Sequence, residues 1–163
     1  MHNILYAIID DASRLIIDWQ HLSTKQASQC IPVVERAIAK FGRPFVIWSD
    51  NGGENRGLFI ESMKAKNIGQ VFIVPNCPYM NGKIERVWPG IEDHCSSWKD
   101  IQRWINRYNT KPHVSLRDHK INGRHIHLSP LQAYKKLQKW EPGMQPLWKV
   151  NDKIQVLKVK DLE

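Results

Sequence analysis

Apolar positions along the chain follow two different periods, which predicts alternating strands and helices. Short unbroken apolar runs predict strands, and apolar residues at every third or fourth position predict helices. The predicted strands are residues 4–9, 15–19, 45–48 and 71–74, and the predicted helices are 27–38, 58–66, 81–88, 97–108 and 130–137. Strands that are joined through helices favour a mixed sheet with parallel neighbours, so the predicted fold class is α/β with extra helices towards the C-terminus.

Turn and capping residues set several of these boundaries. Residues 10–13 predict the tight turn of a hairpin between the first two strands. Ser23 and Gln26 are spaced as in a capping box and predict the start of the first helix. Pro89 should kink or stop the helix that contains Glu85, because proline lacks a backbone N–H and clashes with the carbonyl four residues back.

Three further segments carry expectations about burial and domain organisation. The apolar run 45–48 is typical of a strand buried on both faces. The polar segment 118–124 predicts a flexible insertion between helices, and residues 147–159 predict a small β-hairpin. We therefore expect one domain over residues 1–140 and a hairpin tail over residues 141–163.

Composition indicates a soluble globular chain. Of 163 residues, 42% are apolar and 25% are charged, no apolar run reaches the length of a membrane span, and no signal peptide is evident. The three cysteines are widely spaced and odd in number, which argues against a disulfide framework. We therefore expect an intracellular protein, nuclear in a eukaryote and cytoplasmic in a prokaryote. The net charge of +8 lies mostly in the second half, where residues 81–163 hold 16 Lys or Arg against 9 Asp or Glu. Charge alone favours equally a polyanionic partner and a basic, solvated surface.

Two acidic residues stand where chemistry is expected. Asp50 follows the predicted strand 45–48, at the carboxyl end where open α/β sheets place their sites. Glu85 comes 35 residues later, in the predicted helix after a loop rich in Pro, Gly and Asn. Two such carboxylates could share a hard divalent cation, which prefers oxygen ligands. Each also has an ordinary explanation, Asp50 as a turn residue and Glu85 as a solvated helix residue.

Several segments resemble the retroviral-integrase-like DDE integrase and transposase family. The segment around Asp50, Trp-Ser-Asp-Asn-Gly-Gly-Glu-Asn, looks like its second acidic motif, and Pro-Tyr-Met-Asn-Gly-Lys-Ile-Glu-Arg around Glu85 looks like the loop and helix of its third acid. The spacing of the two acids is within a residue of the family's usual value. Further similar segments are 9–14, 108–113 and 128–134, so the resemblance spans residues 4–137.

The resemblance implies a ribonuclease-H-like fold and metal-dependent phosphoryl transfer that cleaves DNA and joins DNA strands. It makes Asp50 and Glu85 the expected ligands of Mg²⁺ or Mn²⁺. DNA is the expected partner and a homo-oligomer the expected assembly. The resemblance places four residues against DNA, and two arginines four residues apart on the predicted helix 97–108 form a further phosphate-binding candidate or a solvated face. In order, these DNA-binding candidates are Tyr79, Asn81, Lys83, Arg86, Arg103 and Arg107.

The first acid of the family pattern has no clear counterpart. The resemblance implies three antiparallel strands before the first helix, with an acid on the first of them, whereas the sequence predicts only two. Asp10 then belongs to a hairpin turn and the sheet lacks its first strand, which leaves the strand before Asp50 with an open edge. The alternative makes residues 4–9 the first strand and Asp10 the first acid, but the strand count favours the turn.

The function therefore stays open between two main hypotheses. One is an incomplete integrase or transposase core, and the other is an inactive integrase-derived domain that binds DNA or protein. A ribonuclease-H-like nuclease of another family fits the fold but not the motifs around Asp50 and Glu85. Neither His94-Cys95 nor the pair His125 and His127 has the spacing of a zinc site. Trp104 could stack on a base, whereas Trp98 falls on the apolar face of its predicted helix.

Overall fold

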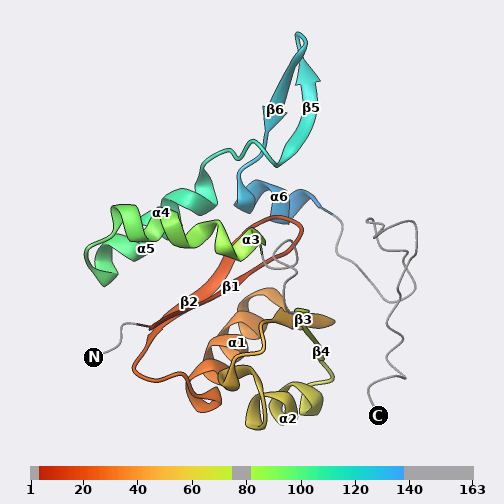
Figure 1. The fold of residues 1–163 in the computed structure, drawn as a ribbon. Coiled ribbons are helices and arrows are strands. Elements are labelled where there is room, and N and C mark those ends of the chain that lie inside the picture. The colour runs from red at the N-terminus through yellow and green to blue at the C-terminus, as the bar shows by residue number, and fades with distance from the viewer. Residues whose placement is uncertain (1–3, 75–81, 138–163) are drawn as a thin grey trace.

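The structure is a computed structural model that describes residues 4–74 and 82–137 (Figure 1). Its elements confirm the α/β class. The first half contains strands β1 (Ile4–Ile9), β2 (Ile16–Leu22), β3 (Val46–Ser49) and β4 (Gly69–Phe72), helices α1 (Ala27–Phe41) and α2 (Leu58–Ala65), and the 3-10 turn η1 (Gly53–Asn55). The second half contains helices α3 (Gly82–Glu85), α4 (Val87–His94), α5 (Trp98–Thr110) and α6 (Pro130–Lys136), and strands β5 (Arg117–Ile121) and β6 (Arg124–His127).

The first four strands form two separate two-stranded sheets. β1 pairs with β2 in an antiparallel hairpin, and β3 pairs with β4 in a parallel ladder. Within the described residues no ladder joins β1 to β3, as expected for a sheet that lacks a strand between them. The prediction of a strand buried on both faces at 45–48 is wrong, because Val46 and Trp48 are 39% and 43% exposed. These two side chains alternate with half-buried neighbours, so one face of β3 is covered and the other is open to solvent.

The β1–β2 hairpin lies between two layers of helices, as Figure 1 shows. Ile4, Tyr6 and Ile8 pack towards the cluster that α1 and α2 build around Phe59 and Met63. The alternate residues of β1 pack towards a second cluster, formed by α4 and α5; they are Leu5, Ala7 and Ile9. Successive strand residues point to opposite faces, so a six-residue run of apolar side chains serves both cores at once.

The first helix does not begin with the predicted capping box. Gln26 occupies the N-cap position of α1 and its side chain makes no capping hydrogen bond. Gln29 takes the expected role instead: its Nε2 donates to Ser23 Oγ at 2.8 Å and its Oε1 accepts from the Ser23 N–H at 3.1 Å. The capping-box prediction is therefore wrong, because Ser23 pairs with a residue inside the first turn of the helix.

Proline does interrupt the helix that carries Glu85, but at a different position from the one predicted. α3 ends at Glu85, Arg86 forms a turn, and α4 begins at Val87. Pro89 lies within the first turn of α4, where a backbone N–H has no partner inside the helix, so its missing N–H costs nothing there. The break therefore precedes the proline instead of following Trp88.

The segment predicted as a flexible insertion forms a β-hairpin whose register shifts between Arg117 and Lys120. β5 and β6 pair antiparallel around Asn122 and Gly123, which have φ of 49° and 78° as a tight hairpin turn requires. The hairpin projects from the body in Figure 1. Lys136 of α6 donates to both carboxylate oxygens of Asp118 at 2.6 Å and so ties the hairpin to α6. The predicted hairpin at 147–159, and with it the tail domain 141–163, lies outside the described residues.

No helix among the described residues is both long and apolar enough to cross a membrane.

Candidate functional site

Asp50 lies directly after β3, in a loop held by its own hydrogen bonds. Its Oδ1 accepts from the Gly52 N–H at 3.1 Å and from the Asn55 Nδ2 at 2.9 Å. Asn55 is only 5% exposed, and its carbonyl accepts from Gln70 Nε2 at 2.7 Å. Because Gln70 belongs to β4, the loop is fixed to the neighbouring parallel strand. Asp50 itself is exposed, and within the described residues its Oδ2 has no hydrogen bond.

The rest of the loop is fixed in the same way. Asn51 Nδ2 donates to the carbonyl of Ile73, and Arg56 donates to Asn51 Oδ1. The Glu54 carboxylate folds back over Gly52, where a Cβ would lie 2.6 Å from Glu54 Oε2. A side chain at position 52 would therefore displace the Glu54 carboxylate from its place over the loop.

Tyr6 of β1 lies within electrostatic reach of this loop. Burial raises the pKa of the Tyr6 phenol well above its ordinary value of 10, and the charges of Cys30, Glu54 and Asp50 raise it further. Burial, followed by the charge of Glu54, raises the pKa of the Cys30 thiol to about 11. Both groups are therefore protonated and uncharged at neutral pH.

Asp10 holds the turn between β1 and β2 through one carboxylate oxygen and its backbone carbonyl. Its Oδ2 accepts from the Ser13 N–H at 2.8 Å and from Ser13 Oγ at 2.6 Å, and its carbonyl accepts from the Arg14 N–H at 2.9 Å. These bonds are those of a turn-forming aspartate, as the strand count indicated.

Glu85 is the last residue of α3 and its side chain is exposed. Within the described residues it forms no hydrogen bond or ion pair. No three residues among His, Cys, Asp and Glu lie close enough to hold a metal in the part of the chain that the structure describes. This also leaves His94, His125 and His127 without a zinc site there. Asp50 and Glu85, the two acids that the sequence motifs single out, both have free carboxylate oxygens within the described residues.

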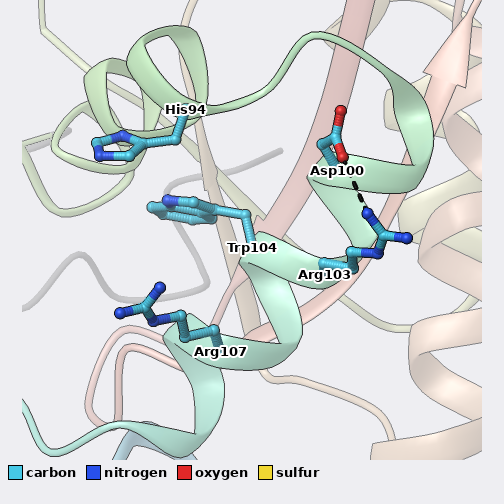
Figure 2. Close-up of a pocket in the computed structure, with 5 residues that line it drawn as sticks. All are labelled: His94, Asp100, Arg103, Trp104 and Arg107. Carbon is cyan, nitrogen blue, oxygen red and sulfur yellow. Dashed lines mark hydrogen bonds and ion pairs between the residues drawn. The ribbon is translucent and has the colours of Figure 1, made fainter.

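The predicted DNA-binding residues fall into two groups. Lys83 Nζ contacts Asp11 Oδ2 at 2.5 Å, which links α3 to the β1–β2 turn, while Arg86 is exposed beside Glu85. Arg103 and Arg107 are exposed on the same side of α5 and line one cavity, together with Trp104 (Figure 2). Tyr79 and Asn81 lie outside the described residues.

Sequence reasoning missed the residues that hold Asp50 in place. Asn55 and Gln70 are ordinary polar residues in the sequence, and their roles depend on the parallel register that sets Ile47 of β3 beside Gln70 of β4. Asn55 carries a weak signal, since it is the last residue of the motif around Asp50. Nothing in the sequence marks Gln70.

The order of elements, with a β-hairpin between helical layers and a carboxylate after a parallel strand, is that of an integrase-like α/β core. The sequence profile of the integrase core domain matches residues 2–111, and the chain belongs to this family.

Solved integrase structures share the fold. A chain of the simian T-cell lymphotropic virus intasome, solved in complex with the PP2A regulatory subunit B56 gamma, superposes with a TM-score of 0.64 at 18% identity over 90% of this chain and 51% of that one. This chain therefore spans about half of that relative. The catalytic core of BIV integrase gives a TM-score of 0.62 at 19% identity, covering 82% of this chain and 86% of that one. The HTLV-2 integrase core in complex with magnesium gives 0.57 at 17% identity, covering 80% and 83%. No curated protein sequence matches the chain.

Proposed function

We propose that the chain is the core of a DNA integrase or transposase that cleaves DNA and transfers strands by metal-dependent phosphoryl transfer. The observation that carries the proposal is the fixed carboxylate of Asp50. Asn55 and the Gly52 N–H hold one of its oxygens, and the other oxygen, at an exposed residue that follows β3, has no hydrogen bond within the described residues. A carboxylate fixed in this way is suited to bind a cation without reorganisation.

The donor set suits Mg²⁺ or Mn²⁺. Both ions prefer oxygen ligands, and Mg²⁺ in particular takes only one or two protein carboxylates and keeps several waters. Asp50 and Glu85 are exposed carboxylates, so they would hold the ion. When bound, the ion would supply positive charge to the phosphoryl group in transfer.

Basic residues next to the acids would position the DNA. Lys83 and Arg86 flank Glu85 on α3 and the turn that follows it, and would hold phosphate oxygens without competing for the metal. The resemblance adds Tyr79 and Asn81 to this surface. A homo-oligomer is proposed on the same grounds, because the HTLV-2 core has been solved in a dimeric form and in a trimeric form.

The test is a strand-cleavage and strand-transfer assay on the full-length protein with Mg²⁺ or Mn²⁺. Asp50→Asn and Glu85→Gln should each reduce the rate at least about 100-fold, since each removes a charge that stabilises the transition state. Glu92→Gln is the matched control, because Glu92 is an exposed acid on α4 that the site does not use. Metal-dependent activity that survives Asp50→Asn would refute the assignment.

A second function is DNA or protein binding without catalysis. The observation that favours it is that Asp10 serves the hairpin turn through its Oδ2, which accepts twice from Ser13, and that no three of His, Cys, Asp and Glu gather among the described residues. This hypothesis expects DNA binding that weakens steeply with salt, tolerates any sequence, and survives Glu85→Gln. Equal affinity at low and moderate salt would contradict it.

A further inference from the structure

A cavity of about 380 Å³ opens between α4 and α5, away from the loop of Asp50. It is lined by His94, Asp100, Arg103, Trp104 and Arg107 (Figure 2). This volume lies at the lower end of the range for small-ligand sites, which is roughly 300–1,000 Å³. Its lining combines an indole with two guanidinium groups, whereas most surface hollows are lined by unrelated side chains.

The indole of Trp104 is held in place before any ligand arrives. A Cβ at position 90 would lie 2.6 Å from Trp104 Cζ2, so the ring sits directly on the backbone of Gly90. Tyr108 stacks on the indole with ring centroids 5.2 Å apart and an interplanar angle of 22°. His113 in turn meets the Tyr108 ring edge-on at 4.4 Å. A planar surface fixed in this way loses little conformational entropy when another ring stacks on it.

Two guanidinium groups and one carboxylate line the cavity beside the indole. In Figure 2 the Trp104 ring projects between the His94 imidazole and the Arg107 guanidinium. Arg107 forms no ion pair within the described residues, so its charge is available. Arg103 is held at the rim by Asp100 at 3.3 Å. The hydrogen bond from Ser97 holds the pKa of Asp100 below its ordinary value of 3.8, so this carboxylate stays charged and keeps Arg103 in place.

We infer that this cavity binds one unpaired nucleotide of a DNA strand, with the base stacked on Trp104 and the adjoining phosphates held by Arg103 and Arg107. A bare phosphate would need only the arginines, and an apolar ligand only the indole. Both together fit a flat ring that is joined to an anion. A base inside a duplex is already stacked between its neighbours, so only an unpaired one can present its face to the indole.

The location fits a strand that also reaches Glu85. The cavity begins at the end of α4, whose eight residues span about 12 Å from the turn after Glu85. The inference deepens the DNA-binding part of the proposed function and rests on it, but it does not require catalysis.

The test compares two fluorescent DNA probes by anisotropy, with the full-length protein: a blunt duplex, and the same duplex with one unpaired dA. The wild type should bind the second probe more tightly. Trp104→Leu should lower that affinity roughly 5- to 150-fold, the loss expected for one stacked base, and leave the blunt duplex within about twofold. Arg107→Gln should also lower the preference, and being exposed it should not disturb folding. Lys99→Gln removes the same charge from α5 outside the cavity and should change both affinities equally.

The outcomes separate the cavity from the proposed function. If Trp104→Leu and Arg107→Gln both leave the ratio of the two affinities unchanged, or if the protein binds neither probe, the inference is wrong. Free dAMP that displaces the unpaired probe at micromolar concentration would assign the cavity to a mononucleotide instead and would also overturn it. If the protein transfers strands but the variants do not change the ratio of the two DNA affinities, the proposed function stands and the cavity inference fails. If the variants change that ratio but the protein transfers no strands, the cavity inference stands and the proposed catalysis fails.

Discussion

The hydrogen bond between Asn55 and Asp50 should be measurable as an energetic coupling between the two side chains. Asn55 is buried, and its Nδ2 donates to the Asp50 carboxylate at 2.9 Å. This bond is the side-chain hydrogen bond that joins the two residues. Asp50→Ala would leave a buried amide without its acceptor, and Asn55→Ala would leave the carboxylate with only the Gly52 N–H. Either single change should destabilise the fold.

The magnitude follows from the geometry. A hydrogen bond to a charged group contributes about 1.5–3 kcal/mol, and the exposure of Asp50 places this one at the lower end. The double variant loses both partners together and so avoids an unpaired buried group. The sum of the single losses should therefore exceed the loss in the double variant by about 1–2 kcal/mol.

Urea denaturation of the wild type, the two single variants and the double variant measures this coupling. Asn106→Ala combined with Asp50→Ala is the control, because Asn106 lies on α5 and pairs with Gln102, so the two losses should add. Additivity in the Asn55 cycle to within about 0.5 kcal/mol would refute the reasoning, since it would mean that the bond does not hold the loop.

Three further predictions concern other contacts. Asp11→Asn should free Lys83 for DNA and so raise the DNA affinity at low salt, which fluorescence anisotropy measures. The same change should alter the free energy of unfolding by less than about 1 kcal/mol, because the ion pair is partly exposed, and urea titration measures this. Gly90→Ala should cost about 1–3 kcal/mol, because its Cβ would collide with Trp104, and thermal unfolding measures the loss. Burial lowers the pKa of His113 below its ordinary value of 6.5, so the folded state binds fewer protons than the unfolded state and stability should fall as pH drops through 6.5 towards the lowered value.

Each of these has its own control. Gly82→Ala on α3 meets no atom within 4 Å and should not destabilise, so a loss there equal to that of Gly90→Ala would show that the collision is not the cause. His113→Gln should remove its share of the pH dependence, and a pH profile identical to the wild type would contradict the assignment. Unchanged DNA affinity in Asp11→Asn would show that Lys83 does not contact DNA.

The sequence was most informative where local pattern and local structure coincide. The β1–β2 hairpin, α2 and α5 were predicted from periodicity, and Ser97 caps α5 as expected, accepting from the Asp100 N–H. The motif around Asp50 identified the family, and the family then supplied the fold. These features depend on residues close together in the chain.

The sequence was least informative where structure depends on contacts across the fold. Gln70 supports Asn55 only because β4 lies parallel to β3, a register that no local pattern sets. The β5–β6 hairpin is a different case, because Asn122-Gly123 is a strong turn signal that the polar composition of the segment obscured. Pro89 is a further case, because the effect of a proline depends on where its helix begins. The sequence predicts one helix over residues 81–88, whereas the structure begins a new helix at Val87.

Anomalous diffraction from crystals of the full-length protein grown with Mn²⁺ shows directly whether Asp50 and Glu85 bind one metal ion together. We expect a Mn²⁺ ion bound to oxygen atoms of both carboxylates at about 2.1 Å, and loss of that ion in Glu85→Gln. An ion bound by Asp50 or Glu85 alone, or no ion at either, would contradict metal binding by the pair and favour a domain that binds DNA or protein without catalysis.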